Sequence, residues 1–137
     1  MMTKLRTKIS LAVILCLSLI ACNSERKING EVSVVTGDGQ NIKLGGIFVK
    51  LYRKSAAELK DLDSGKLLNE PPLRTTTTDP DGKFTFTVMR GEYAVVASYS
   101  RLAGLDVESY SWVVPADARS GDVSLSLNNQ NMETGNK

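Results

Sequence analysis

The sequence predicts an all-β fold, an antiparallel β-sandwich, and three observations support this prediction. Apolar side chains alternate with other residues at a period of two along several short segments, which is the spacing of a strand with one apolar face. Glycine, proline and aspartate clusters separate these segments, as turns separate strands. One short segment alone departs from this pattern. Short alternating strands with frequent turn signals are typical of β-sandwiches.

The alternation predicts seven strands, near residues 28–36, 46–53, 73–79, 83–89, 92–100, 107–114 and 121–127. Turn signals follow the first strand at Gly37-Asp38-Gly39 and precede the fourth at Asp79-Pro80-Asp81-Gly82. Each stripe gives its strand one apolar face. The stripes contain Val32, Val34, Ile47, Val49, Leu51, Phe84, Phe86, Val88, Tyr93, Val95, Ala97, Tyr99, Val123, Leu125 and Leu127.

The segment that departs from the pattern predicts one or two helical turns over residues 56–63, inserted between the second and third strands. Ser55 and Glu58 form a capping-box sequence, with serine as N-cap and glutamate at N3. Gly65 is placed to close the helix, and Leu59 and Leu62 lie on one of its faces. Two interpretations stay open for these leucines: they cover an open end of the sandwich, or they form a partner-binding appendage on a rigid scaffold.

The N-terminal residues 1–21 have the three parts of an export signal. Lys4, Arg6 and Lys8 form the positively charged part, residues 9–19 form the apolar part, and Ala21 is the small residue at the cleavage point. Cys22 follows directly. The stretch Leu19-Ile20-Ala21-Cys22 resembles the lipobox of bacterial lipoprotein signals. This resemblance implies thioether lipidation of Cys22, cleavage between Ala21 and Cys22, and acylation of the new N-terminus with a fatty acid such as palmitate.

Two other interpretations compete with the lipobox. The apolar run is shorter than the roughly 20 residues that a membrane-spanning helix needs, which disfavours a transmembrane anchor. An ordinary secretory signal would leave Cys22 as an unpaired thiol in an oxidising compartment, because Cys16 lies inside the signal and is removed with it. Asn23, where an aspartate would favour retention at the inner membrane, points to the outer membrane if the host is Gram-negative.

The sequence thus divides into four parts. Residues 1–21 are the expected lipoprotein signal peptide, 22–27 a short lipidated tether, 28–127 the β-sandwich domain and 128–137 a polar, disordered tail. We expect the protein in the cell envelope, attached to a membrane by its lipid.

Composition excludes several classes of function. The chain has no histidine, which excludes His-activated nucleophiles and removes the usual ligand of zinc, copper and non-haem iron. We therefore expect no cofactor and no metal ion. The signal carries three of the 17 basic side chains and none of the 15 acidic ones, so the remainder is nearly neutral. A near-neutral domain gives no electrostatic reason to expect nucleic acid as a partner.

Three stretches resemble carboxypeptidase regulatory-like domains: Gly46-Ile47-Phe48-Val49-Lys50-Leu51, Thr78-Asp79-Pro80-Asp81-Gly82-Lys83-Phe84-Thr85-Phe86, and Gly91-Glu92-Tyr93-Ala94-Val95-Val96-Ala97. The resemblance covers about residues 28–127. It implies a seven-stranded, transthyretin-like (prealbumin-like) sandwich and a non-catalytic accessory, adhesive or scaffold role. A weaker resemblance, carried by Ala97-Ser98-Tyr99-Ser100-Arg101-Leu102 and Trp112, is to the lipid-anchored subunit of type VI secretion complexes, which implies a structural role.

Three aromatic residues, Tyr99, Tyr110 and Trp112, are candidates for a platform that binds a sugar or peptide, although aromatics in strands more often lie in the core. Together with Leu59 and Leu62 they make up the expected partner surface. Asp79 and Asp81 invite a calcium interpretation, but a turn is favoured because the twelfth position of an EF-hand-type loop would be Val88. Residues 75–78 are four threonines, which are β-branched and therefore favour a strand; the alternative is that their hydroxyls line a ligand surface.

Three hypotheses of function follow from these observations. The favoured one is a non-catalytic, lipid-anchored sandwich that binds a protein or glycan at the cell envelope. The second is a structural subunit of a secretion or surface assembly. The third is a small envelope hydrolase that uses the carboxylates of Asp106 and Glu108.

Overall fold

The computed structural model describes residues 24–133. Ala21, Cys22 and the whole expected signal peptide lie outside the described residues, as do the last four residues of the expected tail. Within residues 24–133 two four-stranded sheets pack face to face, and this confirms the β-sandwich. No helix in this range is long and apolar enough to cross a bilayer.

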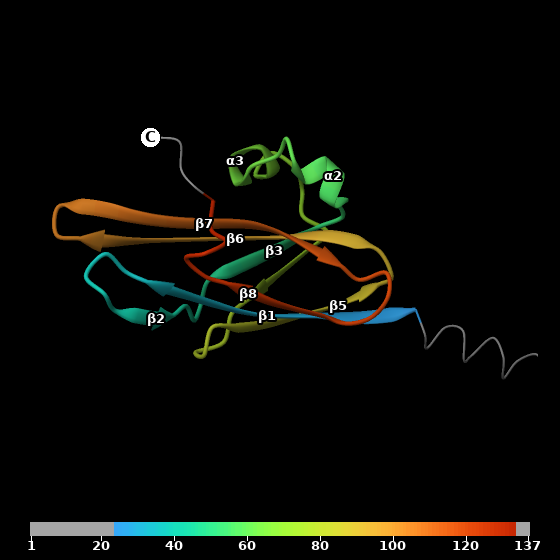
Figure 1. Ribbon diagram of the computed structural model, residues 1–137, viewed down its shortest axis with the longest axis horizontal. Helices are drawn as coiled ribbons and strands as arrows, with labels where there is room; N and C mark the ends of the chain where they lie inside the picture. Colours follow the sequence, from blue (N-terminus) through green and yellow to red (C-terminus); the bar gives the residue numbers. More distant parts are fainter. Residues whose placement is uncertain (1–23, 134–137) are drawn as a thin grey trace, which may run out of the picture.

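The first sheet contains β1 (Glu25–Val35), β2 (Asn41–Lys43), β5 (Lys83–Met89) and β8 (Val123–Leu127). The second contains β3 (Phe48–Tyr52), β4 (Arg74–Thr77), β6 (Glu92–Ala103) and β7 (Asp106–Asp117), in the order β4-β3-β6-β7. Figure 1 shows the two sheets as layers, with helices α2 (Ala56–Leu59) and α3 (Ser64–Leu67) above the second one.

The predicted number of strands was wrong, because the described residues form eight. The additional strand is β2, which pairs with Ser33, Val34 and Val35 through a hairpin turn in which Gly39 has a φ of 85°. Three residues are too few to show an alternating pattern. The antiparallel prediction also has one exception: β8 runs parallel to β1, with Ile28 opposite Val123.

The boundaries of the expected tether and tail were wrong as well. Glu25, Arg26 and Lys27 already pair with β5, and the Lys27 amide donates to Asp122 Oδ1 at 2.8 Å. At the other end, the Asn129 side chain accepts from the Val35 amide and donates to the Val35 carbonyl. These polar contacts order both segments without any apolar stripe, which is the signal on which the sequence-based boundaries depended.

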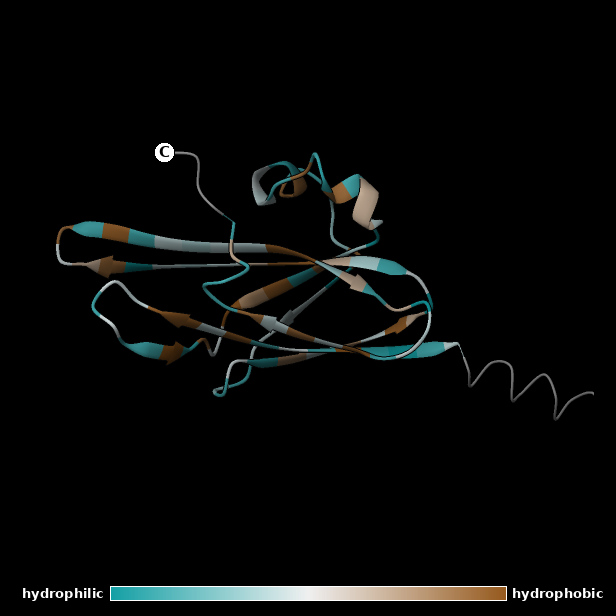
Figure 2. Ribbon diagram, viewed as in Figure 1, coloured by the Kyte–Doolittle hydropathy of each residue, from teal (hydrophilic) through white to brown (hydrophobic). Residues whose placement is uncertain are grey.

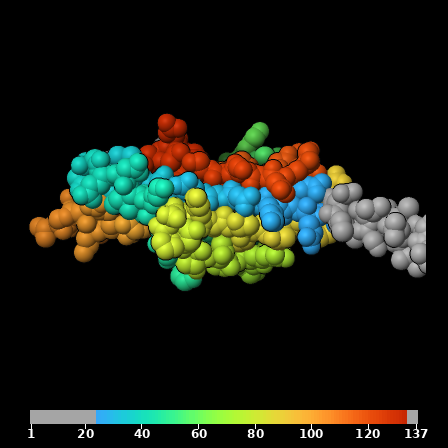
Figure 3. Space-filling view, turned by 90° about the horizontal axis from the view of Figure 1, so that it is seen from below, coloured from blue at the N-terminus to red at the C-terminus, as the bar shows by residue number. Residues whose placement is uncertain are grey.

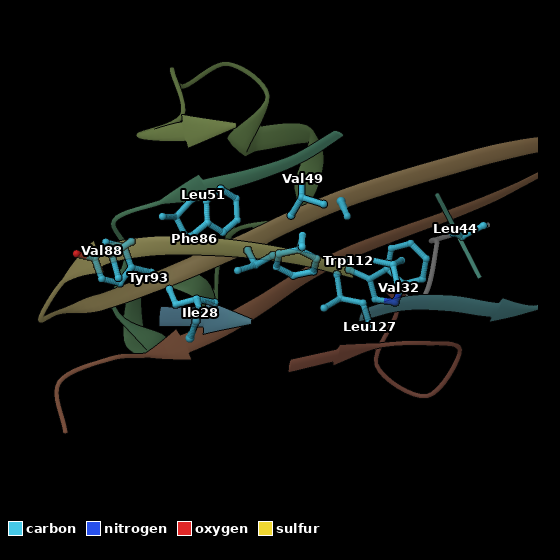
Figure 4. Packing of buried hydrophobic residues seen from close by; sticks show 14 of the residues in the cluster. Ile28, Val32, Leu44, Val49, Leu51, Phe86, Val88, Tyr93, Trp112 and Leu127 are labelled. Carbon is cyan, nitrogen blue, oxygen red and sulfur yellow. The ribbon is translucent and has the colours of Figure 1, made fainter. Parts of the chain in front are cut away.

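The core lies between the sheets and contains the apolar stripes of both. Figure 4 shows part of it, including Ile28, Val49, Leu51, Phe86 and Trp112. Trp112 is completely buried, and its Nε1 donates to the Asn128 carbonyl at 2.8 Å. Phe84 and Phe86 meet edge to face, with ring centroids 5.8 Å apart. The core therefore ties β7 to the segment that follows β8.

The capping box was predicted correctly. The Ser55 side chain accepts from the Glu58 amide, and the Glu58 carboxylate accepts from the Ser55 amide. Of the one or two helical turns predicted over 56–63, one is present, at Ala56–Leu59. The predicted end of this helix was wrong, because Asp63 starts a second helix by accepting from the Lys66 amide, and Gly65 lies inside that second helix.

The insertion covers the outer face of the second sheet, not an open end of the sandwich. Leu59 and Leu62 are half-buried there, beside the buried Leu67. The sheet contributes Tyr52, Ala94, Val96 and Val113 to this second apolar cluster. The leucines therefore hold the insertion on the sheet, which is the structural interpretation of the two.

Candidate binding surface

Two of the three residues of the predicted aromatic platform lie in the core. Trp112 and Tyr110 are buried, and Tyr99 is half-buried and stacks on Tyr110 with ring centroids 6.2 Å apart. All three pack with the main core because their positions along β6 and β7 face the first sheet. The core interpretation is correct for Tyr110 and Trp112, whereas Tyr99 packs on the core and also lines the groove described below.

A polar network closes the inner side of the β6–β7 hairpin beneath these aromatics. Arg101 lies 3.7 Å from Glu108 and 3.8 Å from Asp38, measured from guanidinium nitrogen to carboxylate oxygen. The Tyr110 hydroxyl donates to Glu108 at 3.0 Å. Burial, followed by this contact with the carboxylate, raises the pKa of Tyr110. A hydrogen bond from Thr36 lowers the pKa of Asp38.

This network gives Glu108 a structural role. Its carboxylate pairs with Arg101, which also pairs with Asp38 in the β1–β2 turn, and it lies close to Gly37 of the same turn, where a Cβ would be 2.6 Å from Glu108 Oε1. The carboxylate that the hydrolase hypothesis requires is thus already occupied by an arginine and a tyrosine.

The other two candidate sites, the Asp79–Asp81 segment and the hydroxyls of residues 75–78, have structural roles. Asp79 Oδ1 accepts from the amides of Asp81 and Lys83, which is the turn-capping role. Of residues 75–78, the first three lie in β4, which confirms the strand interpretation. The Thr78 hydroxyl is buried, donates to the Leu44 carbonyl and accepts from the Ile47 amide, so Thr78 has a structural role. Within residues 24–133 no three His, Cys, Asp or Glu side chains gather in a way that would hold a metal ion.

A groove lies on the outer face of the second sheet, beside the insertion, with a volume of about 350 Å³. Strand alternation explains its position: Val49 and Leu51 point into the core, so Phe48 and Lys50 point outward. The Phe48 side chain is 68% exposed although it is a large aromatic group. The groove is lined by Ile47, Phe48, Lys50, Ser64, Leu68, Val96, Ala97, Ser98, Tyr99 and Ser100.

A row of serines continues the groove along the β6–β7 hairpin. Ser98 is opposite Ser111 and Ser100 is opposite Ser109, and the hydroxyl oxygens of Ser100 and Ser109 are 3.1 Å apart. Because these residues alternate with the inward-facing Tyr99 and Tyr110, their hydroxyls lie on the outer face. The next pair on this face is Leu102 and Val107.

The tip of the hairpin is apolar and exposed. Leu102, Leu105 and Val107 are all exposed, Leu105 completely. Figure 2 shows brown segments on both strands close to the turn. This tip lies at one end of the elongated molecule, and β1 begins at the other (Figure 1). The space-filling view in Figure 3 shows the same hairpin, in orange, extending past the body of the sandwich.

Lys50 lines the groove and differs from its neighbour Lys54 in its ion pairing. Within the described residues its ammonium group has no salt bridge and no side-chain hydrogen bond, whereas Lys54 pairs with Glu58 and Glu70. Lys50 is half-buried, and none of the residues that line the groove is acidic. The groove therefore combines a cation without a partner, serine hydroxyls and exposed apolar groups.

Glu133 fixes the wall of the groove. Its carboxylate accepts from the Ser64 amide at 2.9 Å, the Ser64 hydroxyl at 2.6 Å and the Ser111 hydroxyl at 2.7 Å. Its own amide donates to the Ser111 carbonyl, on β7. A residue expected in a disordered tail thus connects α3 to the second sheet.

We predict that Glu133→Ala loosens the insertion while the sandwich stays folded. Loss of three hydrogen bonds to a charged acceptor should raise the rate of amide exchange over residues 56–70 about tenfold or more. Hydrogen exchange with mass spectrometry measures this directly. Glu133→Gln, which keeps one acceptor oxygen, should show a smaller increase, and wild-type rates in the alanine variant would contradict the role of Glu133.

Sequence reasoning missed the groove because its key side chains lie at positions that alternate with the core residues. Phe48 falls between Ile47 and Val49, which belong to the apolar stripe, and so it lies on the opposite face of the strand. An aromatic side chain on the outward face was the one available signal.

The sandwich has a structural counterpart among solved proteins. The chain is similar in fold to a proposed carbohydrate-binding protein from Pseudomonas aeruginosa, with a TM-score of 0.55 and 19% identity, over 77% of this chain and 89% of the other. This similarity supports the β-sandwich fold.

Weaker matches are to a pilin. The shaft pilin SpaA from Lactobacillus rhamnosus GG aligns with a TM-score of 0.46 and 18% identity, over 77% of this chain and 50% of the pilin. A double mutant of that pilin gives a TM-score of 0.45 and 21% identity, over 81% of this chain and 51% of the pilin. The chain thus spans about half the length of the pilin. No family profile and no curated protein sequence matches the chain.

Proposed function

We propose that this protein is a lipid-anchored, non-catalytic binding protein of the cell envelope, with the outer-face groove as its binding surface for a glycan or protein partner. The observation that carries the proposal is the groove itself: an exposed aromatic ring, a cation that has no ion-pair partner among residues 24–133, and a row of hydroxyls on one sheet. The carbohydrate-binding role proposed for the Pseudomonas protein of similar fold is consistent with a glycan partner.

The expected position of the lipid, at the opposite end of the molecule from the β6–β7 hairpin, supports this function. The lipobox resemblance places the lipid on Cys22, and β1 begins only three residues later, at Glu25. A lipid at this position would hold the start of β1 close to the bilayer, since so few residues span at most about 10 Å. The hairpin, at the other end of the molecule, would then point away from the membrane (Figure 1).

A second candidate function is a subunit of a surface or secretion assembly. The apolar hairpin tip favours it, because Leu102, Leu105 and Val107 are exposed together where a neighbouring subunit would be within reach. In this case the tip, not the groove, would be the contact.

Lipid anchoring has a direct test in the full chain. We predict that Cys22→Ser moves the protein from the membrane pellet to the soluble fraction of a Gram-negative host, since the thioether cannot form. Mass spectrometry of the wild-type N-terminus should show an acylated Cys22. The control Cys16→Ser, which changes the thiol inside the expected signal, should leave fractionation unchanged. Equal fractionation of wild type and Cys22→Ser would contradict the anchor.

A further inference from the structure

We propose that the groove binds an acidic glycan, one whose sugar rings carry carboxylates. This inference rests on the proposed function and names the ligand class of the same surface. It requires three contacts: an aromatic ring for the face of a sugar, hydroxyls for its oxygens, and a cation for its carboxylate.

Phe48 supplies the aromatic contact. Its ring is 68% exposed, yet it is held on a central part of the structure, because β3 pairs with both β4 and β6. Leu68, 64% exposed on the other side of the groove, adds a second apolar surface. Two exposed apolar groups on one groove provide apolar surface that a ligand can cover.

The serines supply the polar contacts. Ser98 and Ser100 line the groove, and Ser109 on β7 shares a hydrogen bond with Ser100. Ser111, opposite Ser98, donates its hydroxyl hydrogen to Glu133 and so does not donate to the ligand. Successive outward positions on a strand are about 7 Å apart, so this row of hydroxyls matches the length of an extended ligand better than that of a single small molecule. A hydroxyl both donates and accepts, which matches sugar hydroxyls.

Lys50 supplies the charge and decides between neutral and acidic glycans. Its ammonium group has no acidic partner among residues 24–133, and the residues that line the groove include no aspartate or glutamate. Glu133, the acidic group bonded to the groove residue Ser64, does not line the groove, and three hydrogen bonds from Ser64 and Ser111 hold its carboxylate in place. A half-buried cation without a partner favours an anionic ligand.

The test uses the mature, detergent-solubilised full chain and isothermal titration calorimetry. The probes are trigalacturonate, a hyaluronan tetrasaccharide and sialyllactose, with the methyl ester of trigalacturonate as the neutral match. We expect saturable binding of at least one acidic probe and at least tenfold weaker binding of the ester. Lys50→Gln should weaken binding of the acid about tenfold and leave the ester unaffected, whereas Lys50→Arg should retain most of the affinity.

Phe48→Ala should weaken binding of acid and ester alike, about three- to tenfold, and Phe48→Tyr should restore it. Lys83→Gln is the matched control, because Lys83 is an exposed lysine on β5 of the other sheet. Circular dichroism checks that each variant is folded.

Each other outcome overturns the inference and leaves a defined conclusion about the proposed function. Equal binding of acid and ester, lost in Phe48→Ala, would mean a neutral-glycan groove, and the proposed function would stand. Equally tight binding of an oligothymidylate, also lost in Lys50→Gln, would mean a general anion site. Failure of all three acidic probes to bind the folded protein would exclude the acidic glycan, while the fractionation of Cys22→Ser would still decide the anchor.

Discussion

Replacing Trp112 by alanine should lower the free energy of unfolding by about 3–5 kcal/mol, the usual cost of truncating a large buried aromatic side chain. Trp112 is completely buried in the main core, between the two sheets. The substitution leaves a cavity that the surrounding strands cannot close without losing their own pairing. It also leaves the Asn128 carbonyl without its donor. Urea unfolding followed by far-ultraviolet circular dichroism measures the loss.

Trp112→Phe separates the two parts of this effect. Phenylalanine keeps most of the apolar volume but has no N–H group, so the expected loss is smaller, about 1–3 kcal/mol. Since the lost bond joins β7 to Asn128, the phenylalanine variant should also show faster amide exchange over residues 128–133. An alanine variant that unfolds within 1 kcal/mol of wild type, with an unchanged dependence on urea, would show that Trp112 is not the centre of the core.

The strands that were predicted correctly are those in which buried apolar residues alternate with exposed residues along the sequence. Phe84, Phe86 and Val88 alternate with exposed residues, and β5 shows the same alternation of buried and exposed positions. Beyond Ala97 the inward side chains of β6 become Tyr99 and Arg101, and the outward ones become serines. Backbone pairing with β7 continues there without an apolar stripe, so the length of the hairpin could not be predicted from hydropathy.

The candidate site depends on tertiary contacts that periodicity does not contain. Alternation places Tyr99, Tyr110 and Trp112 on one face, but it does not say which face the other sheet covers. The outer face became a groove only because Leu59, Leu62 and Leu67 pack part of it and Glu133 fixes Ser64 from the far end of the chain. Contacts between residues 64 and 133 leave no local pattern in the sequence.

Gly82→Ala should have the second-largest effect, a loss of about 2–4 kcal/mol, for two reasons that add. Gly82 has a φ of 76°, which a residue with a side chain adopts only with strain. A Cβ there would also lie 2.5 Å from the Val32 carbonyl oxygen and 3.1 Å from the Leu44 amide nitrogen. Both neighbours are backbone atoms, one in β1 and one directly after β2, so neither can be relieved by rotating a side chain and the backbone has to move.

Gly104→Ala measures the cost of a positive φ alone, without the crowding that adds to it in Gly82→Ala. Gly104 has a similar φ of 68°, but nothing lies within 4 Å of the position that its Cβ would take. Its expected cost is therefore only about 1 kcal/mol. Thermal and urea unfolding of the two variants give the difference, which is the cost of crowding at the place where Gly82 donates to Asp79 and accepts from Val32. Equal losses in the two variants would mean that the turn yields freely, and that the aspartate-glycine motif does not hold β1 and β5 in register.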